Sequence, residues 1–314
     1  MESASLLNCT FEVIVGTYED FVLGYVFSNE SKELVQSFAT RSHQGSVRCV
    51  SCTSTLAASG GSDEVIQLYN MVTRKEAGTI MQHEGTISHL QFTPEQSHLI
   101  SCSEDGSIAL YRVGSWQLEK VWASAHKGSG VTSIGIHPSS KMALSLGQNK
   151  TLRTWNLIKG RPAYTVNLSN LGKQMDSVIW STRGSYFAVS SDNKIYVFDV
   201  TLAGIKMTIE CTSRITCMSF LNDTVICFGE NGGFMICHSV QEESELWRIK
   251  VADSRVKCLS CVSEKWIVTG NSDGQIIVWE VSETESQPVQ VAASNIGTRL
   301  ICMSIRTPVK IENN

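Results

Sequence analysis

Hydrophobic and polar positions alternate in short segments along this chain, and turn residues separate the segments. The pattern is clearest in residues 126–157. Residues 131–136 alternate with a period of two, which suits a pleated strand. A turn at His137-Pro138-Ser139-Ser140 ends that segment, and two further apolar segments follow at 142–146 and 151–157. The stretch therefore predicts three strands joined by two turns.

This unit recurs seven times along the chain. Each copy ends in an aromatic residue or its substitute, which follows six residues after an acidic residue or an asparagine, and successive markers are 39 to 44 residues apart. A period near 40–45 residues with four strands per unit is typical of WD40 propeller blades. The sequence predicts an all-β fold, a seven-bladed WD40 β-propeller. The markers are Tyr25, Tyr69, Tyr111, Trp155, Phe198, Cys237 and Trp279.

The first unit lacks its innermost strand. Residues 11–17 and 21–27 predict two inner strands and residues 34–38 an outer one, with nothing before them to pair at the centre. Residues 299–305, RLICMSI, follow a Gly-Thr pair as the inner strands of other units follow similar pairs. We expect them to complete the first blade and close the ring, because closure removes exposed sheet edges. The predicted organisation is one domain over 1–314, with a polar tail from about 306 to 314.

Composition and charge argue against several classes of protein. The net charge of −4 gives no global attraction to nucleic acid or membranes. The chain shows no apolar window long enough for a membrane span and no basic, apolar leader, so neither a span nor a secretory signal is predicted. Eleven cysteines, an odd number, suit reduced thiols inside a cell.

Several units carry a polar set that suits the buried networks of WD40 loops. A histidine, a strand hydroxyl and a turn acid or amide recur at the repeat spacing, and an indole extends some sets. Serine, histidine and aspartate also suggest hydrolase chemistry, but a catalytic triad needs one exposed nucleophile rather than copies at a fold period. We expect structural networks, no catalytic residue, no cofactor and no enzyme. The sets are His43, Ser59 and Asp63; His83, Ser101 and Asp105; His126, Ser145, Asn149 and Trp155; and Thr269, Asp273 and Trp279.

Tyr69 and Tyr111 stand where other units have tryptophan. A tyrosine hydroxyl does not occupy the position of an indole N–H. We therefore expect these two networks to end one hydrogen bond short.

Two Cys-x-x-Cys pairs, Cys49 with Cys52 and Cys258 with Cys261, resemble zinc half-sites. Cys49, Cys258 and their counterparts in two other units occupy one equivalent strand position, where a small apolar side chain fits between blades. One strand per blade does not easily bring four ligands to one point. We expect core packing and no metal.

Three arginines are not explained by the repeat pattern of the fold. Arg214, Arg255 and Arg299 immediately precede the innermost strands of units six, seven and one, which become neighbours when the ring closes. Arginine suits recognition of carboxylate or phosphate, so the three are candidate partner-binding residues. The alternative is ordinary solvated arginines paired with nearby acids such as Glu210 and Asp253. The equivalent positions elsewhere are Ser46, Thr86, Gly130 and Ser177.

Residues 125–161, together with 12–27, 83–92 and 98–117, closely resemble the WD-repeat family of p21-activated protein kinase-interacting proteins. The resemblance covers about residues 11–280, is strongest at 83–162, and includes matches such as LRTWNLIKGR that generic repeat features do not explain. Fungal relatives are ribosome assembly factors. The resemblance therefore implies a nuclear, nucleolar scaffold in large (60S) subunit biogenesis and pre-rRNA processing.

The resemblance also implies an alternative function, the negative regulation of p21-activated kinases by binding their regulatory region. The implied partners are pre-60S assembly factors or that kinase, with local rRNA contact. A membrane partner and a small-molecule substrate are not expected.

Overall fold

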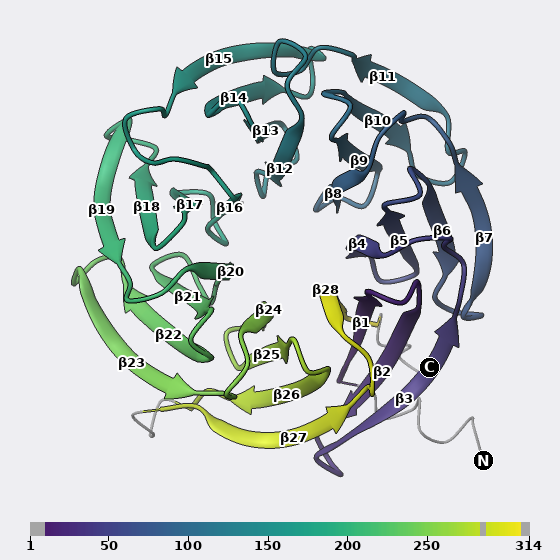
Figure 1. Ribbon diagram of the computed structural model, residues 1–314, viewed down its shortest axis with the longest axis vertical. Helices are drawn as coiled ribbons and strands as arrows, with labels where there is room; N and C mark the ends of the chain where they lie inside the picture. The colour runs from purple at the N-terminus through teal and green to yellow at the C-terminus, as the bar shows by residue number, and fades with distance from the viewer. Residues whose placement is uncertain (1–9, 283–286, 309–314) are drawn as a thin grey trace, which may run out of the picture.

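The structure, a computed structural model, describes residues 10–282 and 287–308. These residues form 28 strands in seven four-stranded antiparallel sheets. The sheets stand as blades around a central axis, each with one strand at the centre and one on the outer edge (Figure 1). The predicted all-β, seven-bladed propeller is confirmed. No helix in the described part is long and apolar enough to cross a membrane.

The blades are numbered 1 to 7 in chain order, and the strands of each blade run from the centre outwards. Blade 1 is β28 (Leu300–Arg306), β1 (Phe11–Thr17), β2 (Val22–Ser28) and β3 (Glu33–Thr40). Blade 2 is β4 (Val47–Cys52), β5 (Leu56–Gly61), β6 (Ile66–Asn70) and β7 (Lys75–Ile80). Blade 3 is β8 (Ile87–Phe92), β9 (His98–Ser103), β10 (Ile108–Arg112) and β11 (Leu118–Trp122). Blade 4 is β12 (Val131–Ile136), β13 (Met142–Gly147), β14 (Thr151–Asn156) and β15 (Arg161–Asn167).

The last three blades follow the same order. Blade 5 is β16 (Ser177–Trp180), β17 (Tyr186–Ser191), β18 (Lys194–Asp199) and β19 (Gly204–Glu210). Blade 6 is β20 (Ile215–Phe220), β21 (Val225–Glu230), β22 (Phe234–Ser239) and β23 (Ser244–Lys250). Blade 7 is β24 (Val256–Val262), β25 (Trp266–Asn271), β26 (Gln275–Glu280) and β27 (Val289–Asn295).

The ring closes as expected, through the C-terminal strand. In Figure 1 the yellow β28 lies beside the purple β1, and the two strands pair antiparallel, with Val13 opposite Ile305. The strand is shifted by one residue from the expectation, because it includes Arg306, which the sequence pattern places in the tail. Residues 309–314 of that tail lie outside the described residues, as do 1–9 and 283–286, so a single domain over 1–314 stays a prediction.

Arg306 belongs to a strand because its guanidinium has a buried partner. It forms an ion pair with Glu12 of β1, whose side chain is fully buried. The same carboxylate lies 3.0 Å from a guanidinium nitrogen of Arg74, between β6 and β7, and accepts a hydrogen bond of 2.6 Å from Ser37 of β3. A buried carboxylate is tolerated only when it is paired and hydrogen-bonded. This network therefore ties the closing strand to blades 1 and 2.

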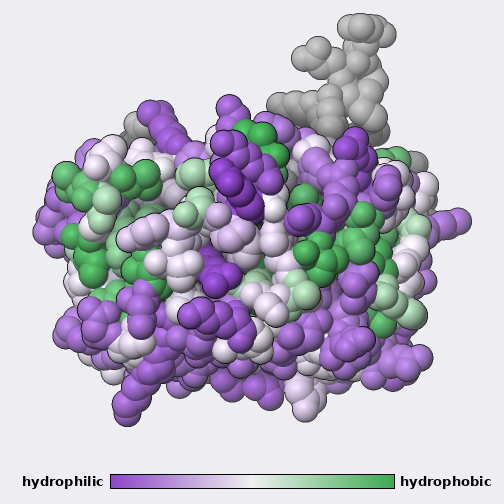
Figure 2. Space-filling model, turned by 90° about the horizontal axis from the view of Figure 1, so that it is seen from above, coloured by the Kyte–Doolittle hydropathy of each residue, from purple (hydrophilic) through white to green (hydrophobic). Residues whose placement is uncertain are grey.

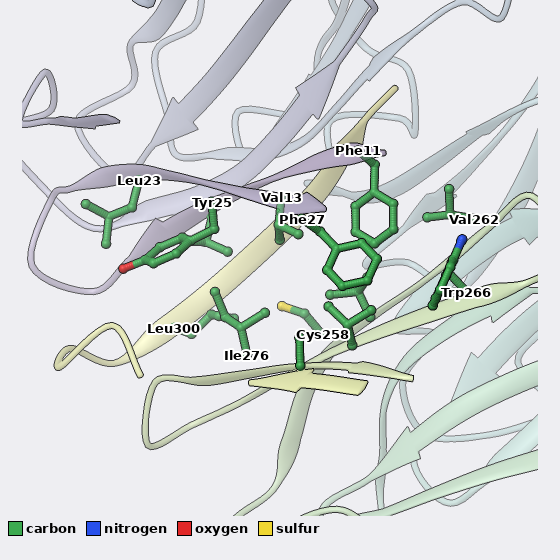
Figure 3. Packing of buried hydrophobic residues seen from close by; sticks show 14 residues of the cluster. Phe11, Val13, Leu23, Tyr25, Phe27, Cys258, Val262, Trp266, Ile276 and Leu300 are labelled. Carbon is green, nitrogen blue, oxygen red and sulfur yellow. The ribbon is translucent and has the colours of Figure 1, made fainter. Parts of the chain in front are cut away.

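The core lies between neighbouring blades, where each sheet face packs against the next. Figure 3 shows the side chains of Phe11 and Phe27 in blade 1 facing Trp266 in blade 7. The ring centroid of Phe27 is 4.9 Å from that of Phe11 and 5.1 Å from that of Trp266. Burying such side chains stabilises the fold by about 1.5–3 kcal/mol each. Each blade interface therefore contributes its own hydrophobic core.

The outermost strands are mostly exposed, as the burial pattern of β7 shows. Seen edge-on, the ring is largely hydrophilic, with hydrophobic residues in separate groups (Figure 2).

Candidate interaction face

The polar sets of blades 2 and 3 form buried hydrogen-bond chains beneath one face of the ring. In blade 2, His43 lies 3.0 Å from Asp63 through Nδ1 and 2.7 Å from Ser59 through Nε2. The carboxylate accepts the Nδ1 proton, since it has none to donate, and Nε2 then accepts the Ser59 hydroxyl proton. The set therefore joins the connecting loop, the second strand and the turn that follows that strand.

His83 repeats the arrangement in blade 3, at 3.1 Å from Asp105 and 2.6 Å from Ser101. Burial lowers the pKa of His83, which favours the neutral ring that this chain of donors and acceptors requires. Ser107 also lies 2.8 Å from Nδ1, a contact that the sequence pattern did not indicate.

Blade 4 carries the longest chain, with a partner that differs from the expectation. The indole of Trp155 donates to Ser145, and Ser145 lies 2.7 Å from Nε2 of His126. Nδ1 contacts Thr151 at 2.7 Å, whereas Asn149 bonds the hydroxyl of Thr151 and the carbonyl of His126. Asparagine thus supports the histidine indirectly. Burial lowers the pKa of His126 to about 4, so this ring is neutral near pH 7.

In blade 7 the network is shorter than predicted. The Trp279 indole donates to Thr269 at 2.9 Å, but Asp273 is exposed and its carboxylate accepts no hydrogen bond from the described residues. Asn271 takes its place, because its side-chain oxygen accepts the backbone N–H groups of Asp273 and Gln275. Asp273 therefore does not join the network.

The two tyrosines behave differently from each other. The expectation of a missing bond is wrong for Tyr69, whose hydroxyl lies 2.9 Å from Ser59. Within the described residues, the buried hydroxyl of Tyr111 has no hydrogen-bond partner.

The Cys-x-x-Cys pairs each divide between two cores. Cys49 packs between blades 2 and 3, whereas Cys52 packs against the core between blades 1 and 2. Cys258 and Cys261 divide in the same way around blade 7. A spacing of three on a strand turns the two side chains to opposite faces, so neither pair brings its thiols together. Burial raises the pKa of the Cys52 thiol to about 12, which keeps it protonated.

The three candidate arginines lie at one end of neighbouring inner strands, and all are exposed. Arg214 donates to Asp176 at 2.8 Å and is therefore neutralised. The guanidinium of Arg299 lies over the ring of Tyr18, 5.4 Å from its centroid. Arg255 forms no ion pair within the described part of the chain. The acids considered as partners bind lysines instead, Glu210 with Lys194 and Asp253 with Lys250.

A feature that sequence reasoning missed lies two residues further along each inner strand. In six blades the pairing register shifts there, by a β-bulge that leaves the second strand residue unpaired. Blade 5 shows no such shift from Ser177 onward. Bulges re-aim side chains. In this ring they turn Arg48 of β4 and Lys257 of β24 toward the central channel.

The channel opens into a cavity of about 680 Å³ at the same end of the ring. Arg48, Lys257, Arg299 and Lys173, the last from the loop before β16, line it together with one carboxylate, that of Glu104. The signal was present in the sequence. Arg48 and Lys257 each follow a rim position by two residues in the repeat alignment, but only the bulge shows that this column faces the channel. No group of histidine, cysteine and carboxylate residues in the described segments is arranged to hold a metal ion.

This fold, with its repeated histidine networks, defines a WD40 repeat protein of the β-propeller class. The family described as "WD domain, G-beta repeat" matches residues 32–70, 74–112, 116–156 and 246–280. Relatives match along nearly the whole chain. A "p21-activated protein kinase-interacting protein 1-like" protein of Danio rerio is 34% identical over 317 residues, which covers 98% of this chain and 83% of the relative.

The "p21-activated protein kinase-interacting protein 1" of Homo sapiens is 32% identical over 94% of this chain and 76% of its own length. "Protein MAK11" of Saccharomyces cerevisiae is 27% identical over 94% of this chain and 83% of its own length. The chain belongs to the WD-repeat family of p21-activated protein kinase-interacting proteins. Both the fold and the relatives' names are typical of non-enzymatic scaffold proteins.

Proposed function

We propose that this protein is a non-enzymatic scaffold that binds assembly factors of the large ribosomal subunit, promotes pre-rRNA processing and works in the nucleolus. Membership of the family supports the scaffold role. The ribosomal part rests on the resemblance carried by residues 83–162.

The observation that carries the docking role is the charge on the face where the channel opens. Arg255 and Arg299 are exposed on adjacent blades and neither forms an ion pair with a described residue, although the chain as a whole is negative. Long-range steering is weak at a net charge of −4, so attraction on this face is local. Exposed charges of this kind contribute little to stability. We propose that they dock an acidic segment of an assembly factor, and that Arg214 contributes less because Asp176 already neutralises it.

Depletion of the protein tests the ribosomal role. Loss of the scaffold is expected to slow processing of large-subunit rRNA precursors, measured by hybridisation, and tagged protein is expected to co-sediment with those precursors. Normal processing after depletion would contradict the proposal.

A second function has one observation in its favour. The relatives in several animals are named as kinase-interacting proteins, and one in Schizosaccharomyces pombe is named "Shk1 kinase-binding protein 15". Under this alternative the same face holds the regulatory segment of a p21-activated kinase and restrains signalling. Sedimentation of the tagged protein on a density gradient distinguishes the two functions. The kinase alternative predicts that the protein co-sediments with the kinase and does not co-sediment with ribosomal precursors.

A further inference from the structure

The mouth of the central channel gathers positive charge around one cavity that is open to solvent. Arg48, Lys173, Lys257 and Arg299 line the cavity of about 680 Å³, against the single carboxylate of Glu104. None of these four cations forms an ion pair with any residue in 10–282 or 287–308. This contrasts with Arg112 at the end of β10, an exposed cation that forms an ion pair with Glu119 of β11.

The fold anchors the backbone of two of these cations, Arg48 and Lys257. Arg48 stands between Val47 and Cys49, which are both buried, and Lys257 stands between Val256 and Cys258, which are buried as well. The anchored backbone fixes where each side chain leaves its strand. Because like charges that share a cavity repel each other, gathering them there opposes folding, and a bound anion would offset this repulsion. The charge and the anchored backbone at these two positions therefore favour a negatively charged ligand.

We propose that the channel mouth binds a compact polyanion that carries several phosphate groups. The cavity volume lies within the range of small-molecule sites, about 300–1,000 Å³. Lysine and arginine are the side chains that proteins use to bind phosphate. Gln148 and Gln174 also line the cavity, and neither side chain makes a hydrogen bond to a described residue, so their amide groups are free to donate to phosphate oxygens.

Two other anionic ligands fit the site less well. A peptide gains most of its affinity from apolar or aromatic anchors in matching pockets, and the apolar lining here is limited to Tyr18, Val131 and Ile301. A nucleic-acid strand needs cations that follow its backbone along a groove. Three of these four come from β24, β4 and the residue before β28, strands that are neighbours at the centre of the ring (Figure 1), and the fourth, Lys173, comes from the loop before β16. All four line one cavity and do not follow a groove.

The site shares Arg299 with the proposed docking surface, but its test does not depend on the scaffold function, because ligand binding is measured on purified protein without any ribosomal particle. We choose inositol hexakisphosphate as the probe and isothermal titration calorimetry of the full chain as the measurement. The expected result is one bound probe per chain. The double variant Arg48→Ala/Lys257→Ala is expected to bind about 100-fold more weakly, since each charge-assisted contact is worth roughly tenfold in affinity.

Three further variants sharpen the test. Lys173→Ala lies in a loop, outside any strand, and is expected to lose about tenfold in affinity with an unchanged melting temperature. Glu104→Gln removes the one carboxylate among the described residues that line the cavity, and is expected to bind several-fold more tightly. Lys159→Ala/Arg161→Ala removes two exposed cations from the outer edge of blade 4 and is the matched control, expected to bind like wild type.

The proposal is overturned if wild-type protein binds no hexakisphosphate, or if Arg48→Ala/Lys257→Ala and Lys173→Ala bind it as wild type does. Tighter binding of a glutamate-rich peptide or of a single-stranded RNA oligonucleotide, each measured in the same way, would also overturn it. Failure of this site leaves the effect of depletion on rRNA processing unchanged, so the two proposals are tested separately.

Discussion

Blades 2 to 4 and the other four blades stabilise the loops that precede their inner strands in different ways. Each of blades 2, 3 and 4 has a buried histidine that links the connecting loop to the second strand, as His43 does through Ser59. Elsewhere the links are shorter. Blade 1 uses Thr17, which bonds the backbone of Phe21, and blade 6 uses Ser213, whose hydroxyl donates to the buried Glu230. The same blade geometry is thus reached with and without the histidine network.

The residue immediately before the inner strand also differs between blades 2 to 4, the histidine-containing sector, and blades 6, 7 and 1, the arginine-bearing sector. Positions immediately before the inner strands are Ser46, Thr86 and Gly130 in the histidine-containing blades, whereas blades 6, 7 and 1 have arginines there. Blades 2 to 4 thus combine a buried histidine network with an uncharged residue before the inner strand, blades 6, 7 and 1 have an arginine there, and blade 5 has Ser177. Departures from a repeat pattern are where function is expected. We therefore expect partners to bind at blades 6, 7 and 1.

The largest loss of stability is expected where the closing strand joins blades 1 and 2. Arg306→Met removes the ion pair of Glu12 with the closing strand and leaves that buried carboxylate with fewer partners. Breaking a buried ion pair in this way is expected to lower the free energy of unfolding by about 3–5 kcal/mol, measured by urea denaturation. Arg112→Met, which breaks the exposed pair with Glu119, is the control and should change it by less than about 1 kcal/mol. Equal effects would mean that the buried pair does not hold the ring closed.

A pH titration tests the histidine-containing sector. The folded pKa of His126 is about 4, below the ordinary value of about 6.5, so the folded state binds fewer protons than the unfolded state. Through His126, the free energy of unfolding is therefore highest above about pH 6.5 and falls as the pH is lowered toward 4. The loss amounts to about 2–3 kcal/mol at pH 4.5. His126→Gln should show a correspondingly shallower fall in stability between about pH 7 and 4.5. An identical fall in both proteins would show that the ring is not buried neutral.

Aspartates in the turns after the second strands show smaller differences, which depend on whether a histidine contacts them. Asp63→Ala and Asp105→Ala should each lower the free energy of unfolding by about 1–3 kcal/mol, because buried donors lose their acceptor. Asp192 of blade 5 has no histidine partner and a φ of 53°, which asparagine tolerates better than alanine. Asp192→Asn should therefore change stability by less than about 0.5 kcal/mol. If Asp63→Ala and Asp105→Ala cost as little as Asp192→Asn, the two carboxylates do not serve as acceptors that stabilise the histidine networks.

The repeat period was enough to predict the fold, because four strands and their turns recur with fixed spacing. The closing strand was also predicted, but its last residue was not, since the pairing of Arg306 with Glu12 joins positions at opposite ends of the chain. Thr151 could not be predicted because Asn149 was expected to contact the histidine itself, whereas the hydroxyl two residues later makes that contact. The repeat alignment places Arg48 and Lys257 in one column, but the bulge that turns this column toward the channel leaves no mark on the hydrophobic pattern, so the direction of the two side chains could not be predicted from the sequence.

The central claim, that the arginine-bearing sector docks a ribosomal assembly partner, is tested most directly by gradient sedimentation of the Arg255→Ala/Arg299→Ala variant. The variant should fold like wild type, because exposed charges without an ion-pair partner contribute little to stability. Lys159→Ala/Arg161→Ala is the matched control. We predict that the rim variant leaves the large-subunit precursor fractions while the control remains in them. Equal amounts of the two variants in those fractions would contradict the claim.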